Sequence, residues 1–190
     1  MKHLLPIAII ILLLACKKET VNNIPHFTFT PEEKKWFTYG IGDEWKFKND
    51  RGDSLTYRVT YIQQFNFRPE YKGNSNVVIA TGESYEAKIE SATDSLIFYF
   101  YKESFDPQKL QLTLMWHSMK GEFAELVAIK NNASFNQKTI NGLTYTTVTP
   151  AVPMNDQVLP FTRFDKAYYD QGAGVIEIID LNGVSWKRVN

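Results

Sequence analysis

The sequence predicts a mostly β protein, an antiparallel meander that forms a barrel, a sandwich or a strongly curved sheet, with one short N-terminal helix. Three observations lead to this prediction. Aromatic residues make up 14% of the 190 residues, and these side chains favour strands. Apolar and polar side chains alternate along most of the chain, and clusters of turn residues interrupt the alternation at short intervals. No internal repeat is evident, which argues against a solenoid or a propeller.

The first fifteen residues predict a secretory signal peptide. A basic start, Met1-Lys2-His3, precedes an apolar run from Leu4 to Leu14. A helix of this length spans about 16 Å, whereas the hydrocarbon core of a bilayer is about 30 Å thick. The run is therefore too short for a stable anchor and has the length of a signal-peptide core. Ala15 and Cys16 follow it, and Cys16 is the only cysteine of the chain, so an internal disulfide is excluded.

The tetrapeptide Leu13-Leu14-Ala15-Cys16 resembles the lipobox of bacterial lipoproteins. The resemblance implies signal cleavage between Ala15 and Cys16, and acyl chains such as palmitate on Cys16. Each buried methylene of an acyl chain contributes about 0.8 kcal/mol, so several chains hold a protein stably on a membrane. The expected organisation is a lipoprotein signal peptide over 1–15, a lipidated tether over 16–30 and a single β domain over 31–190.

Two segments of the predicted domain also resemble a family. Gly-Asp-x-Trp-x-Phe lies within Phe37 to Tyr61, and Tyr-Tyr-x-x-Gly-x-Gly-Val-Ile lies within Tyr168 to Trp186. Together they resemble small uncharacterised outer-membrane lipoproteins of Bacteroidetes. The resemblance implies a lipidated, mostly β domain in the cell envelope, and it carries no established activity. Lys17 is compatible with sorting to the outer membrane, while the choice between its periplasmic and cell-surface faces stays open.

The elements follow from local patterns. Thr30, Pro31 and Glu33 have the spacing of a capping box with proline at the first helical position, which predicts one or two helical turns ending near Phe37. About nine strands follow, and the Asn141-Gly142 pair predicts a hairpin turn. The expected strands surround Trp45 and Phe47 and then cover 55–61, 77–90, 95–102, 110–116, 123–129, 145–148, 175–181 and 184–189, with loops at 66–76 and 150–163.

The alternation also predicts the core, because every second side chain of a half-buried strand faces the interior. The residues expected there are Trp45, Phe47, Leu55, Tyr57, Val59, Leu110, Leu112, Leu114, Trp116, Val175 and Trp186.

Motifs for catalysis or for metal and cofactor binding are missing from the sequence. Beyond the signal peptide the histidines are His26 and His117, which lie far apart and outside any metal-binding spacing. Glu83, Glu86 and Glu90 are the carboxylates considered for glycosidase chemistry, although their spacing is also that of a solvated strand face. We expect no metal, no cofactor and no enzymatic activity. The 21 basic and 21 acidic residues give no electrostatic case for nucleic-acid binding.

Two kinds of candidate site remain. Ser54 and Ser95, each in an Asp-Ser-Leu triplet, resemble O-glycosylation sites of Bacteroidetes envelope proteins, and each triplet is also ordinary chemistry for the start of a strand. Aromatic side chains on strands are candidates for lining a ligand site, with burial in the core as the alternative. These aromatic candidates are Tyr57, Tyr61, Tyr99, Tyr101 and Trp116.

The predicted function is that of a non-enzymatic binding or envelope-maintenance module, held at the outer membrane by N-terminal acyl chains. Two alternatives stay open, a carbohydrate-active or other hydrolase and a lipocalin-like carrier of a small apolar ligand. An enclosed apolar cavity would favour the carrier, and an exposed aromatic patch would favour the binding module. A protein or a glycan is the expected partner besides the membrane, and the sequence does not choose between them.

Overall fold

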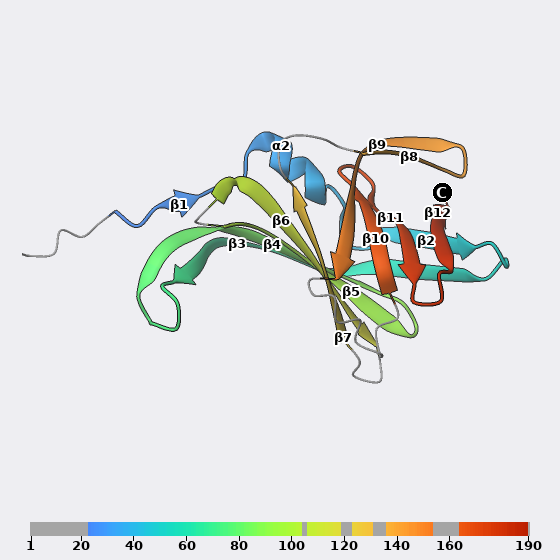
Figure 1. Ribbon diagram of the computed structural model, residues 1–190, viewed down its shortest axis with the longest axis horizontal. Helices are drawn as coiled ribbons and strands as arrows, with labels where there is room; N and C mark the ends of the chain where they lie inside the picture. The colour runs from blue at the N-terminus through green and yellow to red at the C-terminus, as the bar shows by residue number, and fades with distance from the viewer. Residues whose placement is uncertain (1–22, 104–105, 119–122, 131–135, 154–163, 190) are drawn as a thin grey trace, which may run out of the picture.

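The computed structural model describes residues 23–103, 106–118, 123–130, 136–153 and 164–189. These residues form twelve strands, one short α-helix and one 3-10 helix (Figure 1). In chain order the elements are β1 (His26–Phe27), α2 (Pro31–Lys34), η1 (Lys35–Phe37), β2 (Glu44–Asn49), β3 (Ser54–Tyr71), β4 (Val78–Glu90), β5 (Asp94–Glu103), β6 (Asp106–Ser118), β7 (Phe123–Lys130), β8 (Asn136–Ile140), β9 (Leu143–Pro153), β10 (Phe164–Asp170), β11 (Gly174–Asp180) and β12 (Ser185–Val189).

All the described strands belong to one large, curved sheet, and the prediction of a mostly β, antiparallel fold is confirmed. The strand order is β1-β4-β3-β2-β12-β11-β10-β9-β7-β6-β5, with β8 paired to β9. Strand β5, the last in this order, also pairs with β4, the second in the order. Among the strands that the structure describes, only β1 pairs in parallel. Strands β7 and β9 are joined through a short pairing, in which Leu126 and Val127 meet Pro153 and Val152.

The predicted N-terminal helix is confirmed with its cap. The Thr30 hydroxyl accepts the backbone N–H of Glu33 at 3.2 Å, and the Glu33 carboxylate accepts the N–H of Thr30 at 2.7 Å. This reciprocal pair satisfies two of the N–H groups that a helix start leaves open. The chain continues through η1, which places Trp36 and Phe37 against the concave face of the sheet.

Aromatic rings fill the space inside the curved sheet. Tyr169 stacks on Trp36 with ring centroids 5.9 Å apart and donates a 2.6 Å hydrogen bond to the Trp36 carbonyl. Phe37 stacks on Tyr85 at 4.3 Å, and Tyr39 meets the edge of Trp45 at 5.1 Å. The predicted core residues lie here as expected, except that Leu55 and Trp186 are half-buried at its margin. The 3-10 helix η1 thus closes the core with the side chains of Trp36 and Phe37.

The buried tyrosines make stability depend on alkaline pH. Burial raises the pKa of Tyr85 to about 12 and, with the nearby Tyr169 phenol, raises the pKa of Tyr39 well above its usual value. An unfolded tyrosine ionises near pH 10, so between about pH 10 and 12 the unfolded chain loses protons that the folded chain keeps. The contribution of these tyrosines to the free energy of unfolding should therefore be constant below about pH 9 and fall as pH rises above 10.

Urea unfolding at pH 8 and pH 11 tests this expectation. The loss of stability between the two pH values should be smaller in Tyr85→Phe than in the unmodified chain. Tyr71→Phe is the matched control because Tyr71 lies at the surface. An equal loss in all three proteins would show that the core tyrosines do not govern the alkaline transition.

The tether was predicted to cover residues 16–30, but residues 25–30 of this range belong to the fold. The Thr81 N–H donates to the Pro25 carbonyl at 2.9 Å, and the Phe29 N–H donates to the Glu83 carboxylate at 2.7 Å. Phe29 is buried against Phe37. The prediction missed this because the segment is short and polar, yet Phe27 and Phe29 already alternate with His26, Thr28 and Thr30.

The predicted loop at 66–76 is also wrong in its first half. Strand β3 runs on to Tyr71, and Arg68 to Tyr71 pair with the beginning of β4. A register shift between Phe65 and Arg68 allows the strand to continue past Asn66 and Phe67. The result is a long hairpin whose end projects from the body of the molecule (Figure 1).

The outer face of the sheet is covered at β9 to β11 by β8. The Asn141-Gly142 turn joins β8 to β9 as predicted, and Ile140 packs with Val148 and Ile176 in a second, smaller core. The Asn141 amide donates to the Arg188 carbonyl of β12 at 2.8 Å. Strand β9 continues to Pro153 within the loop predicted for 150–163, and residues 154–163 lie outside the described part.

Candidate ligand-binding groove

A groove lies on the outer face of the sheet, over β3 to β6. Alternation places Leu96, Phe98 and Phe100 in the core and turns Tyr99 and Tyr101 outward. On this outer face Tyr101 pairs with Ser84 of β4, and Tyr99 pairs with Thr113 of β6. The register therefore brings aromatic rings and small hydroxyl-bearing side chains together on adjacent strands.

The hollow over these residues has a volume of about 320 Å³ and is more apolar than polar. The register shift in β3 brings Phe65 and Arg68 to its border. Ser84 and Thr113, which also line it, are almost fully buried. Its lining consists of Phe65, Arg68, Ser84, Tyr99, Tyr101, Thr113 and Met115.

Two polar contacts orient the rings. The Arg68 guanidinium lies 4.1 Å from the centre of the Tyr101 ring, in a cation–π contact, and is also 3.6 Å from the Glu70 carboxylate. The Glu86 carboxylate lies on the adjacent strand opposite Tyr99, and burial together with that carboxylate raises the pKa of Tyr99. A ligand in the hollow would meet flat apolar faces, one cation and several hydroxyl groups, which is the composition of many small-ligand sites.

The three carboxylates considered for hydrolysis contact three different partners. Glu83 accepts the Phe29 N–H and holds the N-terminal segment, Glu86 holds Tyr99, and Glu90 forms an ion pair with Lys88 at the far end of β4. The Lys88 hydrogen bond lowers the pKa of Glu90. Glu86 and Glu90 share the outer face, as the spacing predicted. Each of the three carboxylates therefore has a separate structural contact.

The two histidines are also far apart. His26 Nδ1 is 2.9 Å from the Thr81 hydroxyl at the edge of β4, so it belongs to the fold and not to a tether. His117 lies near the end of β6, half-buried, opposite Ser95. Within the described ranges no group of three or more His, Cys, Asp and Glu residues is arranged to hold a metal ion.

The aromatic candidates divide between the two faces of the sheet. Tyr99 and Tyr101 line the groove, and Tyr61 is exposed on the same face. Tyr57 and Trp116 lie in the packed core, which was the alternative considered for them, and they do not line the groove. Phe65, Arg68, Ser84, Thr113 and Met115 were not predicted. For Ser84, its alternation with the core residue Tyr85 could have indicated an outward position. For Phe65 and Arg68, the sequence holds no pattern that indicates the bulge.

The two serines differ in access. Ser54 is exposed at the start of β3, whereas Ser95 is only 9% exposed and follows the buried Asp94. The Asp94 carboxylate accepts the Ser91 hydroxyl at 2.8 Å, which ties down the turn before β5. The burial of Ser95 therefore argues against O-glycosylation at this position. O-glycosylation of Ser54 stays a prediction.

A second hollow of about 410 Å³ lies between η1, the beginning of β9 and the turn after β10, and most of the residues that line it have polar side chains. Its acidic residue, Asp170, accepts two hydrogen bonds from Thr147 and one each from the N–H groups of Gly172 and Ala173. With these bonds the carboxylate joins β9 to the turn after β10. The outer-face groove is therefore the better candidate for a ligand.

The lipidation residues Ala15 and Cys16 lie outside the described residues. Over the part of the chain that the structure describes, neither helix has the length and apolar character needed to cross a membrane. No protein-family model matches the chain, and no curated protein or solved structure is significantly similar to it.

Proposed function

We propose that this protein is a lipid-anchored, non-enzymatic binding module of the outer membrane, and that the groove over β3 to β6 is its ligand site. The observation that carries the proposal is the hollow of about 320 Å³ in which the rings of Phe65, Tyr99 and Tyr101 surround buried hydroxyl groups. Aromatic faces beside hydroxyls suit a glycan, because a sugar ring presents C–H groups on its faces and hydroxyls on its edges. The lipobox-like tetrapeptide ending at Cys16 supports the anchor.

The same observations support binding over the two alternatives. A carrier of a small apolar ligand needs an enclosed cavity, and Trp36, Phe37 and Tyr169 occupy the space inside the curved sheet. A hydrolase of the glycosidase kind needs two converging carboxylates, and Glu83, Glu86 and Glu90 have separate partners.

A matched pair of phenylalanine variants tests the groove. Phe65→Ala removes a ring that lines the hollow, while Phe67→Ala removes a ring two positions later that does not line it. Screening the purified protein against a glycan array and titrating the best binder should show a loss of about tenfold or more in affinity for Phe65→Ala and for Tyr101→Ala. Phe67→Ala should stay within about twofold.

Circular dichroism would establish that each variant keeps the fold. If Phe65→Ala and Phe67→Ala weaken binding equally, the ligand site is not this groove. If the unmodified protein binds no glycan, the proposed ligand class is wrong.

A further inference from the structure

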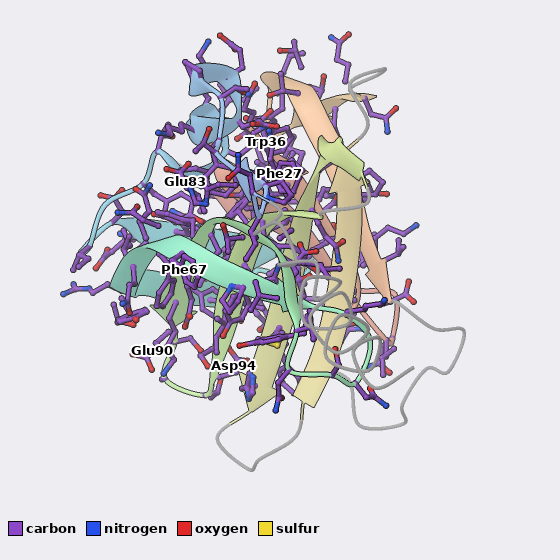
Figure 2. All side chains as sticks on the ribbon, turned by 90° about the vertical axis from the view of Figure 1, so that its left-hand side faces the viewer. Phe27, Trp36, Phe67, Glu83, Glu90 and Asp94 are labelled. Atoms are coloured by element: carbon purple, nitrogen blue, oxygen red, sulfur yellow. The ribbon has the colours of Figure 1, made fainter. Side chains whose placement is uncertain are left out.

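Exposed apolar side chains are concentrated at one end of the molecule. We call residues 63–82, which form the end of the β3–β4 hairpin, the β3–β4 arm. Of the eleven exposed large hydrophobic residues described, five lie on this arm, so the remaining surface is comparatively poor in them. The five are Phe65, Phe67, Tyr71, Val77 and Ile79. Figure 2 views the molecule from the side of the arm, with Phe67 facing the viewer.

The chain that leads to Cys16 leaves the fold beside this arm. His26 and Phe27 of β1 pair with Thr81 and Gly82 of β4, and those residues pair in turn with Pro69 and Arg68 of β3. The pairing of β1 with β4 is parallel. Strand β4 begins at the tip of the arm and runs toward the body, so residues 23–25, which precede β1, lie on the side of the tip. Figure 1 shows β1 and the arm at the same end of the molecule.

The connection between Cys16 and this exit point is short. Eight residue steps separate Cys16 from Ile24, and an extended chain covers about 3.3–3.6 Å per step, or at most about 29 Å. Acyl chains on Cys16 would therefore hold the exit point, and the arm next to it, close to the bilayer surface. Ile24, itself exposed, adds an apolar side chain to the same end.

The chemistry of the arm suits the boundary between headgroups and acyl chains. Tyr71 is 51% exposed, and its aromatic side chain with a polar tip favours that boundary. Phe67, which is 65% exposed, supplies a wholly apolar ring beside it. Lys72 follows at the turn, where its ammonium can meet lipid phosphates. The backbone is largely paired within the hairpin, including a 2.9 Å bond from the Lys72 N–H to the Val77 carbonyl, so insertion exposes few unpaired polar groups.

We propose that the β3–β4 arm inserts four apolar side chains into the headgroup region of the membrane and forms a second contact beside the lipid anchor. The four are Phe67, Tyr71, Val77 and Ile79. This inference rests on the proposed lipidation of Cys16. The anchor would then hold the protein at a fixed orientation, with the groove bordered by Phe65 close to the bilayer surface.

A single fluorophore tests the insertion. Because the one native cysteine is Cys16, which would be lipidated, Phe67→Cys introduces a unique thiol for an environment-sensitive dye. The natively lipidated protein is placed on phosphatidylethanolamine and phosphatidylglycerol vesicles whose lipids carry a nitroxide near the headgroup. Leu181→Cys is the control, because Leu181 is also exposed but lies in the turn between β11 and β12. Quenching should be at least about threefold greater at position 67 than at position 181.

The outcomes separate the anchor from the arm. Protein that floats with vesicles but shows equal quenching at both positions overturns the insertion alone. A dye at position 67 that shifts to the blue without nitroxide quenching also overturns it, since a second copy or another protein would then cover the arm. Protein that does not float with vesicles overturns the lipid anchor and, with it, the insertion.

Discussion

Replacing Gly174 by alanine is expected to lower the free energy of unfolding by about 2–6 kcal/mol, from backbone strain and from a steric clash together. Gly174 has a φ of +78°, which alanine adopts only with strain. A Cβ atom there would lie 2.5 Å from Cη2 of Trp45. The Trp45 ring has little room to move away, because its centroid lies 5.1 Å from that of Tyr39 and 5.7 Å from that of Phe98.

Substitutions at two other glycines distinguish the cost of backbone strain from the cost of the steric clash. Gly183 has a φ of +75° with no atom near a Cβ, so Gly183→Ala should cost about 1 kcal/mol from strain alone. Gly172 has only the Asp170 carboxylate at 3.9 Å, so Gly172→Ala should have little effect. Urea unfolding of the three variants measures their free energies of unfolding, which should be lowest for Gly174→Ala and highest for Gly172→Ala. A Gly174→Ala variant no less stable than Gly183→Ala would mean that Trp45 does not pack against this turn.

Replacing Asp170 by alanine is expected to cost about 2–4 kcal/mol. The carboxylate is almost buried and accepts the hydroxyl and N–H of Thr147 at 2.8 and 3.3 Å and the N–H groups of Gly172 and Ala173 at 3.2 Å. Alanine would leave these donors partly desolvated without an acceptor, and leaving buried donors unpaired is costly. Asp170→Asn keeps one acceptor oxygen and should cost less.

Asp43→Ala is the matched control for this measurement. Asp43 accepts one N–H, from Gly40 at 2.8 Å, in an exposed turn where water can replace it. Its loss should cost about 1 kcal/mol or less. Equal unfolding midpoints for Asp170→Ala and Asp43→Ala would contradict the role assigned to the buried carboxylate.

The sequence predicted those parts of the fold that local chemistry determines. Thr30 and Glu33 formed the capping box that their spacing indicates, and the alternation of Trp45, Phe47, Tyr57 and Val59 correctly gave a buried face. Alternation shows which side chains share a face of a strand, but it does not show whether the opposite face is covered. For this reason Tyr57 and Trp116 were considered for a ligand site that they cannot line.

The groove and the arm depend on features that no local pattern specifies. The shift between Phe65 and Arg68 belongs to the pairing of β3 with β4, and the stretch around it has the polar and proline-containing composition of a loop. The docking of β1 onto β4 joins residues more than fifty positions apart, such as His26 and Thr81. Such long-range pairing follows from the complete fold and not from the segment itself.

The most direct test of a lipid-anchored binding module is the intact mass of the protein purified from its native membrane, together with its distribution between membrane and soluble fractions. The account predicts a chain that has lost residues 1–15, carries acyl chains on Cys16 and sediments with the membrane. Cys16→Ala should keep the fold and move to the soluble fraction. A mature chain recovered from the soluble fraction with an unmodified Cys16 thiol would contradict the account.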